Sequence, residues 1–213
     1  MGTKKYYILV IFFTIVSFGS INAQTKMTDL VDVQSLDSTI IIDIKYATAD
    51  NFLGDTLYTA HICLLRFSVA EKIVMVQKRL RSLGYGLKIW DGYRPLSVQK
   101  RMWEKLPDPG YVANPKYGSN HNRGAAVDVT LVDSDGNELE MPTKFDDFTK
   151  RASSHYPHAS KRALKHRKLL QSVMKEYGFS TINSEWWHFN YKNVKSYPVL
   201  DIPLKEFVNE ARK

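Results

Sequence analysis

We expect the fold to be organised around the stretch Ser119-Asn120-His121-Asn122-Arg123-Gly124-Ala125-Ala126-Val127-Asp128, which carries two potential metal ligands, His121 and Asp128. In a continuous helix, seven residues would separate the two ligands by about 10 Å along the axis, too far for one ion. We therefore predict a loop that turns at Gly124 and leads into a strand over 126–132, where the residues alternate. Such a loop can bring an imidazole and a carboxylate to one point.

Outward from this turn, the sequence predicts a mixture of strands and helices. Apolar residues recur at helical steps in two long segments, and each segment is followed by a glycine. Short β-branched or aromatic runs predict strands. The expected elements are strands over 39–44, 87–90, 126–132 and 186–191 and helices over 67–83, 97–106 and 161–177. Without regular strand–helix alternation, this order indicates a single α+β domain, with a mostly antiparallel central sheet flanked by helices.

The composition is that of an ordinary globular protein. Of 213 residues, 44% are hydrophobic and 24% are charged, and there is one cysteine. These values exclude collagen-like, low-complexity and wholly disordered chains. A single cysteine also excludes an intramolecular disulfide framework and a Cys-rich zinc finger.

The formal net charge of +8 includes six Lys or Arg residues over 161–175, a segment without any acidic residue. We interpret this run as a solvated helix face. A nucleic-acid surface is the alternative, but no Gly-aromatic RNA-binding signature accompanies the charges. We therefore expect no nucleic-acid partner.

The N-terminal residues have the pattern of a secretory signal peptide. Lys4 and Lys5 precede an almost entirely apolar run over 6–18, and Ala23 is followed by polar residues. The run is shorter than the ~20 residues that span a bilayer, so an uncleaved anchor is the less favoured alternative. We expect a signal peptide over 1–23 and one domain over 24–213. The mature protein would then be periplasmic or secreted, without a stable membrane anchor.

A second chemical cluster is Glu185-Trp186-Trp187-His188. His188 is a natural third metal ligand, and Glu185 is a natural general base. Their odd spacing would place them on opposite faces of a regular strand, so a turn near Trp186 must reorient Glu185. Two histidines and one carboxylate leave an open position on a tetrahedral ion, as in catalytic zinc sites. The same set also holds iron, although nothing else in the chain suggests oxygen chemistry.

A third cluster is Trp90-Asp91-Gly92-Tyr93-Arg94-Pro95, directly after a short predicted strand. A rigidly held guanidinium at Arg94 could stabilise the oxyanion of a tetrahedral intermediate. Asp91 is the obvious residue to orient Arg94 or a neighbouring ligand. The alternative is a purely structural Arg–Asp pair.

Two short motifs, Ser-x-His-x-x-Gly-x-Ala-x-Asp over 119–128 and Glu-x-Trp-His over 185–188, resemble those of the zinc D-alanyl-D-alanine dipeptidases of the VanX type. These enzymes share a structural superfamily with the D-Ala-D-Ala carboxypeptidases and the hedgehog amino-terminal domain, whose fold the resemblance implies. It spans nearly the whole mature chain, and also includes residues 45–52, 90–95 and 145–146.

The resemblance implies a complete site. It comprises one zinc ion with three ligands, a catalytic base, a cation that stabilises the oxyanion, and three substrate-binding residues. The zinc ligands would be His121, Asp128 and His188, and the catalytic base would be Glu185. Arg94 would stabilise the oxyanion. Tyr46 and Asp146 would lie near the substrate ammonium, and Ser119 would lie near the substrate carboxylate. The sequence departs from the family pattern at Pro142, where a glycine is usual, and at Asn120, where serine is common.

The activity that this resemblance implies is zinc-dependent hydrolysis of the dipeptide D-alanyl-D-alanine to two D-alanines by metal-activated water, in cell-wall turnover or scavenging. One alternative is a carboxypeptidase that trims D-alanine from muramyl peptides. Another is a catalytically idle, zinc-containing binding domain. The expected partner is a small dipeptide substrate, and the sequence does not predict an oligomeric state.

Overall fold

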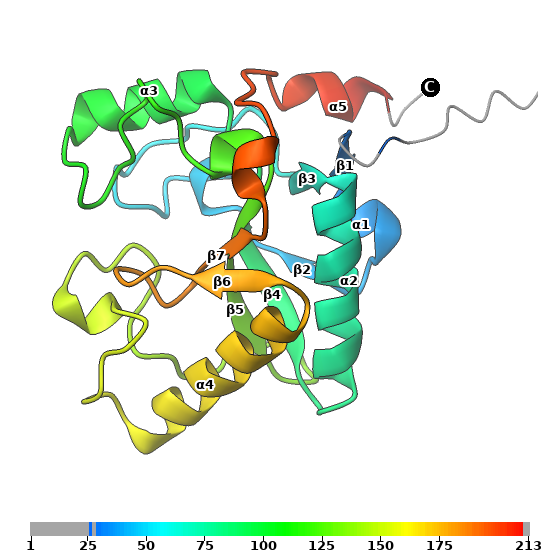
Figure 1. The fold of residues 1–213 in the computed structure, drawn as a ribbon, viewed down its shortest axis with the longest axis vertical. Helices are drawn as coiled ribbons and strands as arrows, with labels where there is room; N and C mark the ends of the chain where they lie inside the picture. Colours follow the sequence, from blue (N-terminus) through cyan, green and yellow to red (C-terminus); the bar gives the residue numbers. More distant parts are fainter. Residues whose placement is uncertain (1–25, 27–28, 211–213) are drawn as a thin grey trace, which may run out of the picture.

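A five-stranded sheet forms the centre of the protein (Figure 1). The computed structural model describes residue 26 and residues 29–210. The strands are β1 (Leu30–Asp32), β2 (Ile41–Ile42), β3 (Leu64–Arg66), β4 (Gly86–Asp91), β5 (Ala126–Val132), β6 (Phe179–Thr181) and β7 (His188–Tyr191). The α-helices are α1 (Val33–Leu36), α2 (Phe67–Arg81), α3 (Leu96–Lys105), α4 (Lys161–Glu176) and α5 (Lys205–Glu210). Short 3₁₀ turns are η1 (Lys45–Ala47), η2 (His121–Arg123), η3 (Lys150–Ala152) and η4 (Val194–Ser196).

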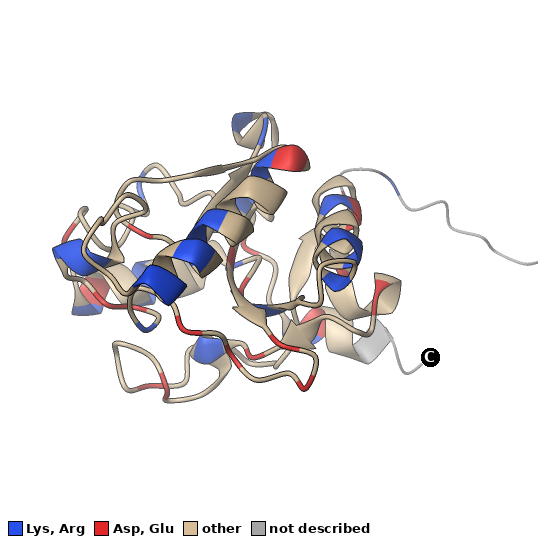
Figure 2. Cartoon of the chain, turned by 90° about the horizontal axis from the view of Figure 1, so that it is seen from below, with Lys and Arg blue, Asp and Glu red and all other residues tan. Residues whose placement is uncertain are grey.

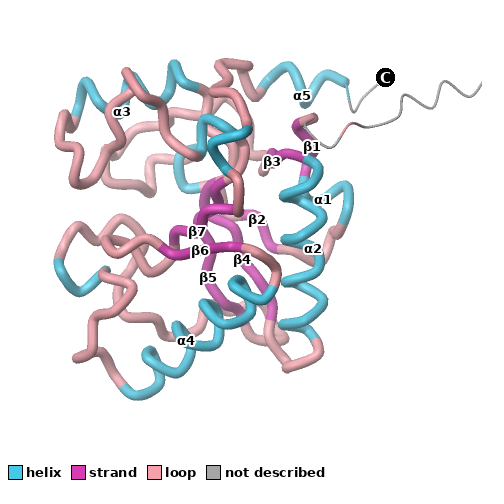
Figure 3. Tube along the Cα trace, in the orientation of Figure 1, coloured by secondary structure: helices cyan, strands magenta, loops and turns pink. Residues whose placement is uncertain are grey.

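The sheet is mostly antiparallel, as predicted. Its strand order is β2-β4-β5-β7-β6, and only the short β2 runs parallel to its neighbour, β4. A separate two-stranded sheet pairs β1 with β3. Figure 3 shows the strands gathered in the middle of the molecule, with helices and long loops around them. The α+β fold class is therefore confirmed.

The two long helices stabilise the sheet by burying one apolar stripe each. Helix α2 packs against β4, helix α4 packs against β5 and β6, and the two helices contact each other. Ile73 and Leu80 of α2 and Leu170 and Met174 of α4 are fully buried. Removing apolar surface from water in this way is the main force that holds such layers together. Strand β5 is buried along its whole length, so the sheet presents a rigid central strand.

The basic run of α4 lies on its outer side, where Lys and Arg positions follow one another along the helix (Figure 2). Five of the six side chains are exposed: Lys161, Arg162, Lys165, Lys168 and Lys175. The sixth, Arg167, is buried and donates a hydrogen bond to the carbonyl of Tyr156 at 2.8 Å. The prediction of a solvated helix face is therefore confirmed for these basic side chains, with the exception of Arg167.

The predicted elements are present, with different ends in several cases. The strand over 126–132 is observed as predicted, but the strand over 39–44 shrinks to Ile41–Ile42. The strand expected over 186–191 begins only at His188, because residues 186–187 form a bend. Strands β1, β3 and β6 and helices α1 and α5 were not predicted.

The expected signal peptide over 1–23 lies outside the described residues and remains a prediction. In the part of the chain that the structure describes, no helix has both the length and the apolar character needed to cross a membrane.

Candidate active site

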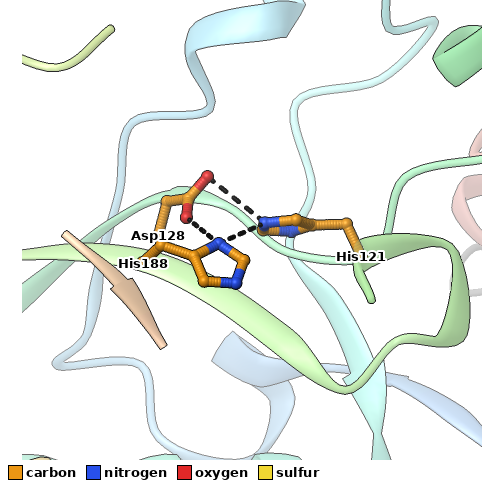
Figure 4. Close-up of side chains that lie close together, drawn as sticks. All are labelled: His121, Asp128 and His188. Carbon is orange, nitrogen blue, oxygen red and sulfur yellow. Dashed lines mark hydrogen bonds and ion pairs between the residues drawn. The ribbon is translucent and has the colours of Figure 1, made fainter. Parts of the chain in front are cut away.

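Strand pairing brings two of the predicted ligands together. In the antiparallel register of β5 and β7, Asp128 lies directly opposite His188. Directly opposed residues of a pair of strands project to the same face. The Nδ1 atom of His188 is 3.0 Å from Oδ1 of Asp128 (Figure 4). The pairing of β5 with β7 therefore brings together two residues that are 60 positions apart in the sequence.

His121 reaches the same point from the turn η2, which precedes β5. Its Nε2 atom is 3.4 Å from Oδ2 of Asp128 and 3.1 Å from Nδ1 of His188. The turn ends at Gly124, whose φ of 65° is left-handed, a conformation that glycine adopts without penalty. A Cβ atom there would lie 2.7 Å from Cδ2 of Leu30. The turn predicted at Gly124 is thus confirmed, and it requires glycine.

Hydrogen bonds donated by the outer ring nitrogens orient the two imidazoles so that their inner nitrogens face each other. Nδ1 of His121 lies 2.8 Å from the carbonyl oxygen of Gly92, which can only accept. Nε2 of His188 lies 2.9 Å from Oδ1 of Asn190. With protons on these outer nitrogens, the inner nitrogens present their lone pairs to one another. Two lone pairs at 3.1 Å require a proton or a metal cation between them.

The electrostatics of the three side chains also favour a positive charge at their centre. Although burial opposes ionisation, the charges and hydrogen bonds of His121 and His188 hold the pKa of Asp128 well below its ordinary range. Burial disfavours the charged form of His188, but its hydrogen bond to Asp128 and the charges of Asp128 and Glu185 raise its pKa to about 9. These residues could therefore hold a metal ion, and all three are buried.

The spacing of the cluster fits a tetrahedral zinc ion. At the usual Zn–N length of ~2.0–2.1 Å, two nitrogens on one tetrahedral ion lie about 3.3 Å apart. The two inner imidazole nitrogens are 3.1 Å apart. Ligand atoms of all three residues lie within 4.8 Å of one another. The donor set is the one that catalytic zinc sites use, with a position left for another ligand.

Glu185 stands beside this cluster without being part of it. It lies in the loop before β7, and its Oε2 atom is 3.9 Å from Nδ1 of His188. Burial raises the pKa of the Glu185 carboxyl group above its ordinary value. The bend at Trp186 and Trp187 provides the reorientation that the odd spacing of Glu185 and His188 demanded.

Backbone and side-chain contacts fix this loop. The hydroxyl of Ser154 donates to the carbonyl of Glu185 at 2.9 Å, and the backbone N–H of Trp186 donates to Ala152 at 2.8 Å. The indole of Trp186 donates to Oγ1 of Thr143 at 2.9 Å. Both tryptophans are fully buried, so they fill the core as well as backing the site.

Arg94 is buried and held on two sides. Its Nε and Nη2 atoms donate to Oδ2 of Asp91 at 3.1 and 2.6 Å, and its Nη1 atom donates to Oε1 of Gln99 at 2.9 Å. Asp91 also accepts the hydroxyl proton of Tyr58 at 2.6 Å and lies 3.5 Å from Nδ1 of His121. Asp91 therefore orients Arg94 and also lies against a predicted metal ligand, as the sequence suggested.

The predicted substrate-binding residues lie around the same cavity. The hydroxyl of Tyr46 is 3.2 Å from each carboxylate oxygen of Asp146. Asp146 has a φ of 55°, an unusual backbone conformation that is enriched at functional sites. Burial, together with the charge of Asp128, raises the pKa of Asp146 to about 8. The backbone N–H of His121 donates to the hydroxyl of Ser119 at 3.2 Å.

All eight predicted site residues line one cavity of about 320 Å³: Tyr46, Arg94, Ser119, His121, Asp128, Asp146, Glu185 and His188. The departure at Pro142 does not remove Asp146 from this cavity. At the second departure, Nδ2 of Asn120 donates to Oδ1 of Asn190 at 2.8 Å. Asn120 thus supports the residue that orients His188.

Gln99 and Asn190 are supporting residues that sequence reasoning missed, as is Tyr58, which donates to Asp91. Asn190 lies two residues after His188 on β7, and this spacing places both side chains on one face of a strand, so it could have been found. Gln99 is a fully buried amide on α3, and no spacing or motif signals its contact with Arg94.

Comparison with known proteins gives consistent matches over this whole region. The protein-family model Peptidase M15, described as D-ala-D-ala dipeptidase, matches residues 26–207. The D-alanyl-D-alanine dipeptidase of Escherichia coli (strain K12) is 39% identical over 182 residues, covering 85% of this chain and 94% of that protein. The corresponding protein of Enterococcus faecium is 31% identical over 189 residues, with 76% and 92% covered. That of Streptomyces coelicolor (strain ATCC BAA-471 / A3(2) / M145) is 33% identical over 188 residues, with 77% and 92% covered.

Proposed function

The chain belongs to the Peptidase M15 family of D-ala-D-ala dipeptidases, and from this premise we propose that it hydrolyses D-alanyl-D-alanine to two molecules of D-alanine. One observation carries the proposal: a single cavity of about 320 Å³ is lined by a His/Asp/His cluster that could hold a metal ion, a carboxylate outside that cluster and a buried guanidinium. Peptide hydrolysis needs a means of activating water, a base and a group that stabilises the oxyanion.

We propose that one zinc ion per chain is held by His121, Asp128 and His188. The spacing of the inner nitrogens and the charge of the cluster support this assignment. When bound in such a site, zinc polarises a carbonyl group and lowers the pKa of water to about 7. The outer hydrogen bonds from the two rings, to Gly92 and Asn190, would keep the ligands in place before the metal arrives.

Glu185 would act as the catalytic base. Its raised pKa brings the carboxylate closer to the range in which it can accept and return a proton near neutral pH. Glu185 would take the proton of the attacking water and then pass it to the departing amine of the second D-alanine. Its distance of 3.9 Å from the inner nitrogen of His188 places it beside the ligand cluster.

Arg94 would stabilise the negative charge that develops on the carbonyl oxygen. Because Asp91 and Gln99 already hold its guanidinium, little reorganisation is needed when this charge appears. Asp146 and Tyr46 would receive the substrate ammonium, and Ser119 would receive its carboxylate. Recognition of both charged ends favours a free dipeptide over a longer chain.

Release of D-alanine from two substrates tests the proposal. The zinc-loaded chain beginning at Gln24 should release D-alanine from D-Ala-D-Ala and not from a muramyl pentapeptide that ends in D-Ala-D-Ala. Release from the pentapeptide alone would instead indicate a D-Ala-D-Ala carboxypeptidase. Failure on both substrates with zinc bound would indicate a catalytically idle, zinc-containing binding domain.

We also propose that the protein works outside the cytoplasm, in the periplasm or as a secreted enzyme. The support for this is the sequence pattern over 1–23. Sequencing the N-terminus of protein recovered from the extracytoplasmic fraction should give a chain that begins at Gln24. Recovery of chains that begin at Met1 from the cytoplasm would contradict export.

A further inference from the structure

Two aromatic rings from different loops meet at the edge of the cavity. Tyr111 lies in the loop that follows α3, and Phe148 lies in the loop that leads to η3. Both loops are on the side of the molecule away from α2 (Figure 1). The ring centroids are 4.6 Å apart, with planes tilted by 40°. Tyr111 is 44% exposed, so part of its side chain faces solvent.

Phe148 belongs to the half of the cavity that we assign to the substrate ammonium. It follows Asp146 by two residues, and its ring packs edge-on against Phe52 at 5.1 Å. Phe52 in turn packs edge-on against Tyr46 at 6.3 Å. A continuous aromatic row therefore runs from the Tyr46–Asp146 pair to Phe148.

Tyr111 also lines this cavity, and its loop is connected to Arg94. Its neighbour Val112 is buried, and the carbonyl of Ala113 accepts a hydrogen bond from Nε2 of Gln99 at 2.7 Å. Gln99 also holds Arg94, so the loop of Tyr111 is tied to the residue assigned to the oxyanion. The contact between Tyr111 and Phe148 thus joins the loop that is connected to Arg94 with the loop that carries Asp146.

A second cavity adjoins the first, and both rings line it. It has a volume of about 590 Å³, and Tyr111, Phe148, Ser184 and Glu185 line it as well as the first cavity. Its other walls mix hydroxyl, charged and aromatic side chains. Space for additional peptide residues therefore exists next to the assigned base, and the two rings are among the residues that line both cavities.

We propose that Tyr111 and Phe148 determine substrate length: their rings form a wall that confines the substrate to a dipeptide, and the second cavity would receive the extra residue of a longer peptide if the wall were removed. The inference rests on the proposed function and deepens it. Because a single ring contact forms the wall, the two rings can separate briefly while a dipeptide enters. A bound tripeptide would instead have to keep the two rings separated, because its third residue would lie between them.

The test compares D-Ala-D-Ala-D-Ala with D-Ala-D-Ala, because both peptides keep their free charged ends. In Phe148→Ala and Tyr111→Ala, the ratio of kcat/KM for the tripeptide over the dipeptide should rise by about tenfold or more, the size that pocket contacts contribute to specificity. Phe148→Tyr keeps a ring and should keep the wild-type ratio. Tyr117→Ala is the matched control, since Tyr117 lies in the same loop, is 70% exposed and lines neither cavity.

A second readout does not depend on activity. The rate at which the chelator 4-(2-pyridylazo)resorcinol removes zinc from the loaded protein should rise in Phe148→Ala and Tyr111→Ala and stay unchanged in Tyr117→Ala. An unchanged substrate ratio in both wall variants would overturn the proposal. If the wild-type protein does not hydrolyse D-Ala-D-Ala at all, the proposed function fails, and the zinc-removal rates alone then decide whether the two rings form a wall.

Discussion

Nε2 of His121 and Nδ1 of His188 lie 3.1 Å apart, while the other nitrogen of each ring is turned outward to a protein acceptor. Two imidazoles in this arrangement cannot both be neutral and satisfied without a cation between them. Either a proton or a metal cation can occupy the position between the two nitrogens, and the outward acceptors, the Gly92 carbonyl and Asn190, fix the ring orientations that place it there.

Replacing Asn190 with alanine should weaken zinc binding. Asn190 accepts the outer proton of His188 and so sets which nitrogen faces the metal. Loss of such an outer partner typically costs about 10–100-fold in metal affinity. The dissociation constant for zinc can be measured by competition with a chelator. Ser180→Ala, an exposed change at the position paired with Asn190, should leave this constant unchanged, and an unchanged constant in Asn190→Ala would refute the role.

Glu185→Gln should remove activity without removing the metal. The amide cannot accept the proton of water, so kcat for D-Ala-D-Ala should fall by about 10²–10⁴-fold. Zinc content should stay near that of the wild type, because Glu185 lies outside the ligand cluster. Steady-state kinetics and metal analysis check both statements. Near-normal kcat in Glu185→Gln would exclude Glu185 as the base.

Asp91→Asn should destabilise the protein far more than an equivalent change on the surface. Asp91 is fully buried, and its removal leaves the Arg94 guanidinium without its counter-charge. Breaking a buried pair in this way typically costs about 3–5 kcal/mol. The control is Asp55→Asn, whose partner Arg101 is 3.4 Å away and where both side chains are about half exposed, so the loss should stay below about 1 kcal/mol. Urea unfolding of both variants measures the loss in the free energy of unfolding. Equal losses in the two variants would contradict the assigned role of Asp91.

Asp146 should make the metal-free protein less stable as the pH rises. Burial and the charge of Asp128 raise its pKa from 3.8 to about 8, so the folded state retains a proton that the unfolded state releases. Its contribution to stability is therefore fully present below pH ~4 and is lost as the pH rises towards ~8, by at most about 1.4 kcal/mol per pH unit. The free energy of unfolding can be measured in urea for the wild type and for Asp146→Asn, both freed of metal by a chelator. The difference between the two free energies of unfolding should change between pH ~4 and ~8. Parallel pH curves would show that the carboxyl group is not perturbed.

The sequence predicted those parts of the fold that depend on local pattern. The strand over 126–132 and the turn at Gly124 follow from alternation and from the need for a left-handed residue, and both are present. Strands β1 and β3 were missed because each has three residues, too few to show a period, and their pairing is made entirely by tertiary contacts. The strand expected to include Trp186 was too long, because the chain bends there to aim Glu185 at the cavity.

The candidate site was predictable where chemistry resides in a motif. The eight residues named from the sequence line one cavity. Each of them belongs to one of the sequence segments on which the family resemblance rests. The supporting contacts were not predictable in the same way. Gln99 and Tyr58 reach Arg94 and Asp91 only through the packing of separate elements, and the contact of Tyr111 with Phe148 joins two loops that share no sequence pattern.

Zinc titration of the chelated protein, followed by D-alanine release from D-Ala-D-Ala, tests the central claim most directly. We predict that the chelated chain is inactive and that activity rises linearly with added zinc to a plateau at one ion per chain. His188→Ala should show no such recovery at the same zinc concentrations. Full hydrolysis by the chelated wild-type chain, or equal recovery in His188→Ala, would contradict the account.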